Sequence, residues 1–473
     1  MIPLSLAEIA AVVGGQQHDI PDPDVRVTGP VVIDSREVVP GGLFAAFAGE
    51  YVDGHDYAER AVAAGAVAVL ATRPVGVPAV VVPDVVAALG ALARAVTGRL
   101  GATVVGLTGS AGKTSTKDLI GQLLERLGPT VCPAGNLNNE IGLPVTALRA
   151  TEDTRHLVLE MGARGIGHIR YLAELTPPRI GLVLNVGTAH IGEFGGREQI
   201  AVAKGELAES LPAAAEGGVA VLNADDPLVR AMAGRTKARV VLFGEAADAD
   251  VRAADVRLTA AGQPAFTLHT PTGCADVTMR LYGEHHVSNA LAAAAVAHEL
   301  GMPVQEIASA LSGAGQLSRW RMEVTERADG VTIVNDAYNA NPESMRAALR
   351  ALAAMGDAAK ARGGRTWAVL GKMAELGEES LAEHDAVGRL AVRLNVSKLV
   401  AVGGREAAWL CMGAYNEGSW GEESVHVSDV RAAVDLLRSE LRPGDVVLVK
   451  GSRSVGLERV AEQLLAAEGE VTG

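Results

Sequence analysis

The hydrophobic positions of the chain follow a repeated rhythm beyond about residue 99. Short apolar runs alternate with helix-length segments, and such alternation predicts parallel strands joined by crossover helices. A polar stretch at 245–276 interrupts the rhythm, and we interpret it as an antiparallel hairpin insert. We predict strands at 103–107, 157–159, 180–186 and 219–222 before the interruption, and at 331–334, 366–370, 398–402 and 445–449 after it.

The first hundred residues have a different pattern. A turn-rich stretch begins at Asp34, and an Ala-rich, helix-like run then leads into 66–70, a short apolar run typical of a buried strand. The predicted fold class is therefore α/β with three domains. We expect a small α/β domain at 1–98, a central parallel-sheet domain at 99–316 and a Rossmann-like domain at 317–473.

Composition agrees with a globular chain of this organisation. The 473 residues are 48% hydrophobic and 21% charged, and at about 150 residues per domain the length predicts roughly three domains. A net charge of −14 and an aromatic content of 3% disfavour a nucleic-acid partner, which needs a basic surface or stacking rings. We expect any bound anion to be held locally.

The cysteines and the N-terminus indicate where the protein works. The three cysteines lie far apart without a CxxC pair, as is usual in a reducing compartment. The N-terminus has no basic n-region, and the longest apolar stretch, 61–72, is too short to cross a bilayer. We therefore expect a cytoplasmic protein without a membrane span.

The strongest motif is a glycine-rich turn between a predicted strand and a helix. Glycines at such a place let backbone amides converge on phosphate oxygens at the helix N-terminus, a lysine adds charge, and a threonine hydroxyl can reach Mg²⁺. The context therefore predicts a P-loop in the central domain. The turn consists of Thr108, Gly109, Ser110, Ala111, Gly112, Lys113 and Thr114.

This turn departs from the usual GxxxxGK[ST] pattern, because Leu107 stands where the first glycine would be. The alternative is an ordinary strand-to-helix turn with a solvated Lys113. The strand before the turn and the helix after it favour a site for a nucleoside triphosphate. Since no Asn-Lys pair occurs, the Asn-Lys-x-Asp element of guanine recognition is missing, and we predict ATP.

Two further polar residues follow the next predicted strands. Glu160 comes directly after 157–159, and His190 follows 180–186. Because parallel strands share one carboxyl edge, both are expected beside Thr114. Glu160 is then placed to bind the same Mg²⁺ as Thr114, and His190 to hold a second ion or an oxyanion. The alternative for each is a capping or solvated role.

Lys204 lies on the apolar side of a helix predicted at 197–211. A buried ammonium is costly unless it is paired or neutralised. Lys204 therefore either extends to solvent or pairs with Glu206 or Glu209, or it is a lysine of lowered pKa inside the site.

Together these residues resemble the Mur ligases, ATP-dependent enzymes that lengthen the peptide of the bacterial cell-wall precursor. The resemblance covers nearly the whole chain and rests on the order and spacing of many short runs. These are Asp34-Ser35-Arg36, Gly49, Asp53-Gly54-His55, the turn 108–114, and the runs 138–144, 160–162, 203–206, 223–227, 283–289, 321–323, 336–342, 370–377 and 450–452.

Within that family, the runs 336–342 and 370–377 look like the member that joins D-alanyl-D-alanine to UDP-N-acetylmuramoyl-tripeptide through an acyl phosphate. The resemblance implies ATP and Mg²⁺ as cofactors, and we expect a monomer. It implies catalytic roles for Lys113, Glu160, His190, Lys204 and Asp336. It implies ATP contacts from the turn, Asn289, Arg321, Asp336 and Tyr338, Mg²⁺ ligands at Thr114, Glu160, His190 and a carbamylated Lys204, and UDP contacts at Ser35 and Arg36.

Two alternatives stay open from the sequence. A folylpolyglutamate synthetase or another muramyl ligase would keep the fold and change the substrate. A nucleotide-dependent switch or transport ATPase would use the phosphate turn without ligation, although the inward Lys204 and the run 336–342 argue against it. The runs 164–168 and 283–286 depart from the pattern of many relatives.

Overall fold

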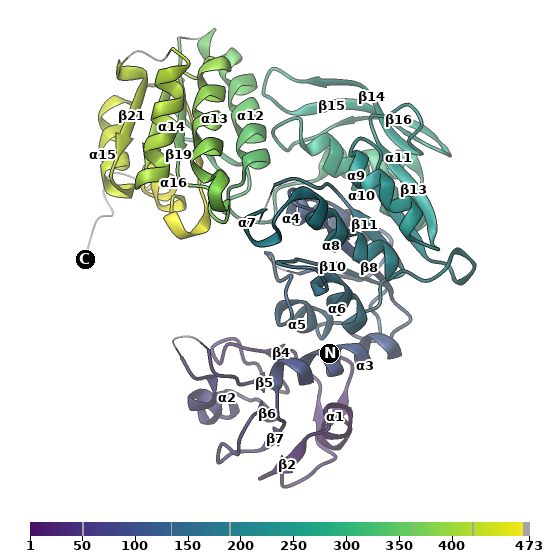
Figure 1. The fold of residues 1–473 in the computed structure, drawn as a ribbon. Helices are drawn as coiled ribbons and strands as arrows, with labels where there is room; N and C mark the ends of the chain where they lie inside the picture. The colour runs from purple at the N-terminus through teal and green to yellow at the C-terminus, as the bar shows by residue number, and fades with distance from the viewer. Residues whose placement is uncertain (50–51, 134, 189–190, 362, 419–420, 467–473) are drawn as a thin grey trace.

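The computed structural model describes residues 1–49, 52–133, 135–188, 191–361, 363–418 and 421–466. It arranges them in three parts, coloured purple, teal and green to yellow along the chain (Figure 1). No helix within these ranges has the length and apolar character needed to cross a membrane.

The first part is built on a small mixed sheet with helices beside it, which agrees with the α/β class predicted for it. Its strands β4 to β7 run parallel, and β2 pairs antiparallel with β7. The apolar run predicted at 66–70 overlaps β6, which is buried along its length. In spatial order the strands are β2 (Gln16–His18), β7 (Ala79–Val81), β6 (Ala68–Ala71), β5 (Leu43–Ala45) and β4 (Val31–Val32); beside them lie β1 (Leu4–Ser5), β3 (Arg26–Val27), α1 (Leu6–Val13) and α2 (Ala58–Ala63).

The middle part is built on a larger sheet in which β8 to β13 run parallel. The four strands predicted before the polar stretch are present, although β11 is shorter than 180–186. The predicted insert is antiparallel, with three strands instead of two. In spatial order the strands are β16 (Gly273–Thr278), β15 (Pro264–Thr270), β14 (Val251–Leu258), β13 (Arg239–Gly244), β12 (Val219–Asn223), β11 (Ile180–Val183), β8 (Thr103–Thr108), β10 (His156–Glu160) and β9 (Thr130–Val131).

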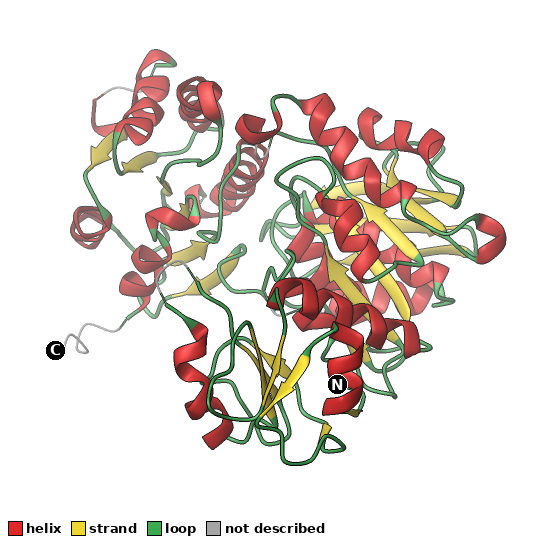
Figure 2. Cartoon of the chain, turned by 60° about the horizontal axis from the view of Figure 1, so that its bottom comes forward, coloured by secondary structure: helices red, strands yellow, loops and turns green. Residues whose placement is uncertain are grey.

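Helices cover both faces of this sheet, because its central strands are apolar on both sides. Figure 2 shows strands of the larger parts lying between helices. One face carries α4 (Lys113–Leu124), α10 (His286–Glu299) and α11 (Val304–Gly313); the other carries α5 (Gly142–Ala147), α6 (His168–Leu175) and α8 (Arg197–Glu209).

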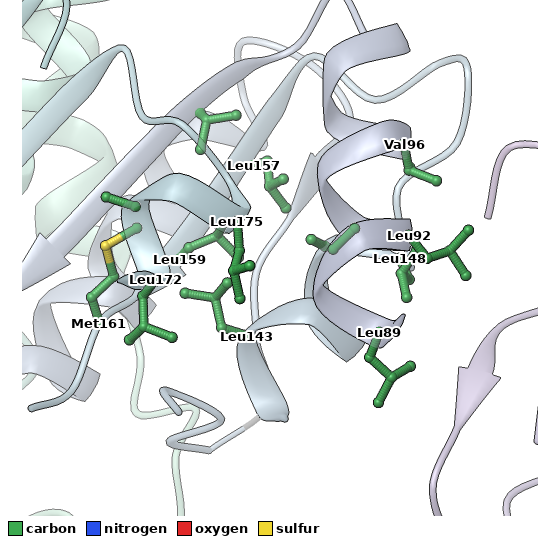
Figure 3. Packing of buried hydrophobic residues seen from close by; sticks show 14 of the residues in the cluster. Leu89, Leu92, Val96, Leu143, Leu148, Leu157, Leu159, Met161, Leu172 and Leu175 are labelled. Atoms are coloured by element: carbon green, nitrogen blue, oxygen red, sulfur yellow. The ribbon is translucent and has the colours of Figure 1, made fainter. Parts of the chain in front are cut away.

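Helix α3 (Val85–Arg99) joins the first part to the middle part through a shared core. In Figure 3, Leu89 and Leu92 project towards the purple first part, while leucines of α5 and α6 lie on the other side of α3. The contact is so close that a Cβ on Gly90 would lie 2.8 Å from Leu175 Cδ2. Hydrophobic packing thus continues past residue 98, and the domain division there stays a prediction.

The strand order opens a crevice at the carboxyl edge of the middle sheet. From β8 the chain moves to β9 and β10 on one side and then to β11 on the other. Ligands in open α/β sheets bind where connections diverge in this way. Glu160, at the end of β10, pairs in register with Leu107 of β8, so its side chain is brought to the start of the glycine-rich turn.

The last part contains a second parallel sheet, with β17 antiparallel at one edge. The four predicted strands are β18, β19, β20 and β22. The sequence missed β17 and β21, because they are short, partly exposed and lack an apolar run. In spatial order the strands are β17 (Glu323–Glu326), β18 (Thr332–Asn335), β22 (Val446–Lys450), β19 (Thr366–Leu370), β20 (Lys398–Val402) and β21 (Ser424–Val427), with α12 (Pro342–Lys360), α13 (Ser380–Arg393), α14 (Arg405–Asn416), α15 (Val430–Glu440) and α16 (Glu458–Leu465) around them.

Candidate active site

A cavity of about 1330 Å³ lies where the carboxyl edge of the middle sheet faces the last part. Side chains that the sequence assigned to separate motifs line it together. From the middle part these are residues 109–114, Glu160, Lys204 and Asn289, and from the last part Arg321, Asp336 and Tyr338.

The glycine-rich turn presents an anion site at the start of α4. Gly112 has φ +80°, and a Cβ there would lie 2.6 Å from Asn289 Oδ1, so glycine is required. No side chain caps α4, which leaves the amides of its first turn for a ligand and adds the helix dipole. Lys113 Nζ donates to the Gly109 carbonyl at 2.8 Å. Burial lowers the pKa of Lys113, while Glu160 opposes this shift.

Asn185, which the sequence did not single out, holds the first half of the turn. Its Oδ1 accepts from the amides of Ser110 at 3.0 Å and Ala111 at 2.9 Å, and its Nδ2 donates to the Ala111 carbonyl. The Gly187 amide donates to Ser110 Oγ at 2.9 Å. Thr108 is fully buried at the end of β8, behind the cavity lining. Asn185 could have been found from the sequence, because it is the polar residue that directly follows the apolar run at 180–184.

Thr114 and Glu160 face each other, as the sequence predicted. Thr114 Oγ1 donates to Glu160 Oε2 at 3.0 Å, and Asn138 Nδ2 donates to Glu160 Oε1 at 2.7 Å. Glu160 is only 1% exposed, so these contacts fix its carboxylate. Carboxylate and hydroxyl oxygens are suitable Mg²⁺ ligands. In the described part of the chain, no cluster of three or more His, Cys, Asp or Glu side chains forms a metal site.

His190 lies outside the described residues, so its role stays a prediction. The described loop just before it contacts the last part. The amide and hydroxyl of Thr188 each donate to Glu343 Oε1 at 2.9 Å. Asn341 Nδ2 also donates to the Ser110 carbonyl at 3.4 Å. The start of α12 therefore touches the phosphate turn and the loop that leads to His190.

Lys204 is buried in the wall of the cavity. Lys204 is only 6% exposed, and its side chain forms no hydrogen bond or ion pair with the other described residues. Burial lowers its pKa well below the ordinary lysine value, and the charge of Lys113 lowers it further. The structure therefore favours a neutral amine at this position over a solvated ammonium.

The carboxylates considered as partners for Lys204 bind other groups. Glu206 accepts from the amides of Gly167 at 2.5 Å and Arg170 at 3.1 Å, at the start of α6. Glu209 pairs with Arg170 and, at 2.8 Å, with Arg235. The alternatives in which Lys204 pairs with either carboxylate, or reaches bulk solvent, are therefore wrong.

The nucleotide contacts expected from the last part are held in a network. The Arg321 guanidinium lies over the Tyr338 ring, 4.2 Å from its centroid, and donates from Nη2 to Thr114 Oγ1 at 3.1 Å. Asp336 Oδ2 pairs with Lys450 Nζ at 2.6 Å. Lys450 belongs to a run that carries the family resemblance, but its partner was not predicted.

Two histidines lie beside Asn289 at the start of α10. Burial lowers the pKa of His285 to about 4, against the opposing charge of Asp336. Burial also lowers the pKa of His286 well below its ordinary value. Both imidazoles are thus neutral at pH 7, and His286 lies within 3.5 Å of Asn289 Nδ2.

Ser35 and Arg36 are not brought into this cavity. They lie in the first part, just after β4. Arg36 donates from Nη2 to Asp34 Oδ2 at 2.5 Å, and this contact lowers the pKa of Asp34 to about 2. Ser35 is buried, whereas the Arg36 side chain is 74% exposed.

Family models match all three parts of the chain. The model described as "Mur ligase family, catalytic domain" matches residues 30–97, "Mur ligase middle domain" matches 107–297, and "Mur ligase, glutamate ligase domain" matches 320–453.

Similar proteins cover nearly the full length. UDP-N-acetylmuramoyl-tripeptide--D-alanyl-D-alanine ligase from Mycobacterium tuberculosis (strain ATCC 25618 / H37Rv) is 52% identical over 98% of both chains. MurF from Acinetobacter baumannii has a TM-score of 0.85 at 32% identity, covering 98% of this chain and 99% of its own. MurF ligase from Thermotoga maritima in complex with ADP has a TM-score of 0.78 at 32% identity, covering 92% and 97%. The chain therefore belongs to the Mur ligase family.

Proposed function

We propose that this chain uses ATP to join D-alanyl-D-alanine to UDP-N-acetylmuramoyl-tripeptide, releasing ADP and phosphate. The observation that carries the proposal is that the phosphate turn, the Thr114–Glu160 pair and Lys204, which has no partner among the described residues, line one cavity with side chains of the last part. The 52% identity to a curated ligase of that name over 98% of both chains supports the choice of substrates.

ATP is proposed to place its phosphates at the start of α4. Lys113 and the first amides of α4 supply positive charge there, and Arg321 adds a guanidinium 3.1 Å from Thr114 Oγ1. Asn289 and Tyr338 line the cavity beside them and are proposed to hold the nucleotide, with Asp336 kept in place by Lys450. The T. maritima relative bound to ADP supports nucleotide binding by this fold.

Mg²⁺ fits the oxygen atoms at the end of β10. Glu160 and Thr114 would hold one ion, and His190 and Lys204 a second; when bound, the ions neutralise charge on the phosphates. An amine lacks the anionic oxygen that such a site needs. A neutral Lys204 amine can add CO₂, forming an N–C bond and releasing a proton, which gives a carbamate anion. The burial and lowered pKa of Lys204, and the absence of a partner for it in the part of the chain that the structure describes, support this modification.

The chemistry requires that a carboxylate becomes an electrophile. The terminal carboxylate of the tripeptide attacks the γ-phosphate of ATP and yields an acyl phosphate and ADP. The free amine of D-alanyl-D-alanine then attacks the acyl carbon through a tetrahedral intermediate, and phosphate leaves. Negative charge builds on oxygen in both steps, and Lys113, Arg321 and the amides of α4 are placed to stabilise it. Contacts such as Thr188–Glu343 bring the last part over the cavity, where it can exclude water.

The UDP end is proposed to lie on the first part. A guanidinium suits a diphosphate, and Arg36 is exposed, although it must be shared with Asp34. Ser35 is proposed as its neighbour in this contact. The domain divisions near 98 and 316, the monomeric state and the cytoplasmic location stay predictions from the sequence.

The test is ADP release with UDP-N-acetylmuramoyl-tripeptide and D-alanyl-D-alanine, each omitted in turn. We expect sustained ADP release only when both are present, and little with D-glutamate, L-lysine or L-glutamate as the acceptor. Turnover with glutamate and a folate would favour the folylpolyglutamate synthetase. ADP release independent of any acceptor would favour the switch or transport ATPase.

A further inference from the structure

Helix α4 carries a buried ion pair to which the proposed reaction gives no role. Lys117 is 1% exposed and Asp118 is 7% exposed, and Lys117 Nζ lies 2.6 Å from Asp118 Oδ1. Removing two charges from water offsets most of their mutual attraction, and an apolar pair of similar volume often stabilises a fold equally well. Stability alone therefore does not account for this pair, which lies one turn after Thr114.

Lys117 anchors the loop that reaches Glu160. Its Nζ donates to the carbonyls of Pro133 at 2.7 Å and Gly135 at 3.1 Å, in addition to its contact with Asp118. All three donors of the ammonium are thus used. A few residues further on, the side chain of Asn138 donates to Glu160 Oε1 at 2.7 Å. The loop at 135–139 is therefore fixed to α4 at one end and to Glu160 at the other.

Asp118 anchors the linker between the middle and last parts. Its Oδ2 accepts the Ser318 amide at 3.1 Å inside the protein. One turn further along α4, Gln122 exchanges two hydrogen bonds with the backbone of Gly315, at 3.0 and 3.1 Å. The linker at 315–322 is thus tied to successive turns of the same helix.

The linker needs this support because its backbone is strained beside Arg321. Trp320 has φ +58° and Met322 has φ +52°, in the left-handed region that side-chain-bearing residues adopt at a cost. Between them, Arg321 reaches back to Thr114 Oγ1. Such strain persists only where surrounding contacts hold it, and Asp118 supplies one of those contacts.

We infer that Lys117 and Asp118 are positioning residues that fix two walls of the cavity, the 135–139 loop and the 315–322 linker, to one turn of α4. Through Asn138 the first wall orients Glu160, and through Arg321 the second reaches Thr114. Both walls meet at the same Thr114–Glu160 hydrogen bond. This inference rests on the proposed function where it is tested by enzyme kinetics. Hydrogen exchange and thermal stability test it without any enzymatic turnover.

The test compares Lys117→Met and Asp118→Leu with a matched control, Asp445→Asn. Asp445 is also buried and paired, with Arg365 at 2.7 Å, but lies in the last part away from the cavity lining. Amide hydrogen exchange is measured with and without ADP, together with kcat, KM for ATP in the presence of Mg²⁺, and Tm. We expect faster exchange at 135–139 in Lys117→Met and at 315–322 in Asp118→Leu, and neither change in Asp445→Asn.

The kinetic expectation separates the two walls. Lys117→Met raises KM for ATP in the presence of Mg²⁺ by about tenfold, because it loosens the loop that orients the proposed Mg²⁺ ligand Glu160. Asp118→Leu lowers kcat by up to about a hundredfold, the order of loss that follows a displacement of about an ångström. If either single variant fails to fold, the double variant Lys117→Met/Asp118→Leu removes both charges together. We expect it to recover Tm while exchange at both walls stays fast.

Three results would overturn the inference. One is exchange at both walls unchanged from the wild type. The second is kinetics within twofold of the wild type while Tm falls as in Asp445→Asn, which would make the pair merely stabilising. The third is a double variant that recovers Tm together with slow exchange at both walls. A wild type that releases no ADP with both substrates would refute the proposed reaction alone, since exchange would still report the anchoring.

Discussion

The two larger parts of the molecule are both built on mainly parallel sheets between helices, yet the lysines at their carboxyl edges differ in their partners. In the middle part, Lys204 has no partner among the described residues, and Lys113 donates to a backbone carbonyl. In the last part, Lys450 pairs with Asp336 at 2.6 Å and Arg346 pairs with Glu383 at 2.6 Å. The cavity-lining lysines of the middle part therefore have no carboxylate partner among the described residues, whereas Lys450 and Arg346 of the last part have one. Arg321 is the exception in the last part, because it contacts Thr114 and the Tyr338 ring and stays available to an anion.

This difference shows how one architecture supports two roles. The fold provides a sheet edge where loops converge. Whether an anion can bind there depends on whether the basic side chains at that edge already pair with carboxylates. Buried cations without partners lower stability, so their presence marks a functional site. Cations that are paired position neighbouring groups instead, as Lys450 does for Asp336.

The largest expected effect is on stability in the last part. Lys450→Met leaves Asp336 with an uncompensated charge in a buried place, which costs about 3–5 kcal/mol of unfolding free energy. Urea unfolding measures this loss, with Lys113→Met as the matched variant in the middle part, expected to be as stable as the wild type. A loss below about 1 kcal/mol would mean that the Lys450–Asp336 pair contributes no more than a surface ion pair. It would contradict the contrast drawn between the middle and last parts.

The next effect is on activity in the middle part. Lys113→Ala is expected to lower the rate of ligation by roughly a hundred- to a thousandfold, because one preorganised donor to a developing oxyanion carries about that much. Its Tm is expected to stay at or above the wild-type value, since burial disfavours the Lys113 ammonium. Retention of more than half of the activity would refute the assignment of the phosphate turn.

A variant at Lys204 tests whether this buried amine is converted to a carbamate anion. Lys204→Ala is expected to lower the rate by about a hundredfold, and formate is expected to restore part of it by supplying the missing carboxylate. Lys237→Ala, on the exposed surface, is the control and is expected to match the wild type. Wild-type rates in Lys204→Ala, without a response to formate, would count against the carbamate.

The smallest effect concerns His285, which lies where the two parts meet. Its pKa is about 4 in the folded protein, against about 6.5 when unfolded, so between these values the unfolded chain binds one more proton. Stability therefore falls as the pH falls, by about 1.5 kcal/mol between pH 6.5 and 5. Thermal or urea unfolding across this range measures the slope. A slope of the same size in His285→Asn would assign the effect to other groups.

The sequence by itself determined the parallel sheets and the phosphate turn, because both depend on residues that are close together along the chain. Apolar runs of strand length predicted β8, β10, β19 and β22, and the glycine-rich turn stands between a strand and a helix as expected. Short edge strands such as β17 and β21 escaped notice, since half-exposed strands carry little apolar signal. Glu160 was predictable for the same reason as the turn, as it ends an apolar run.

Apart from the Thr114–Glu160 contact, only the tertiary structure decided which partners the polar side chains of the site have. Asn185 meets the turn 75 residues away along the chain, and Asp118 meets Ser318 across 200 residues. Likewise, Glu206 and Glu209 are close to Lys204 in the sequence and were considered as its partners. Because α6 and η3 (Ala231–Arg235) pack against α8, Glu206 instead accepts from the Gly167 amide and Glu209 pairs with Arg235. Periodicity follows from neighbours along the chain, whereas pairing depends on distant segments that only the packed sheets and helices bring within hydrogen-bonding distance.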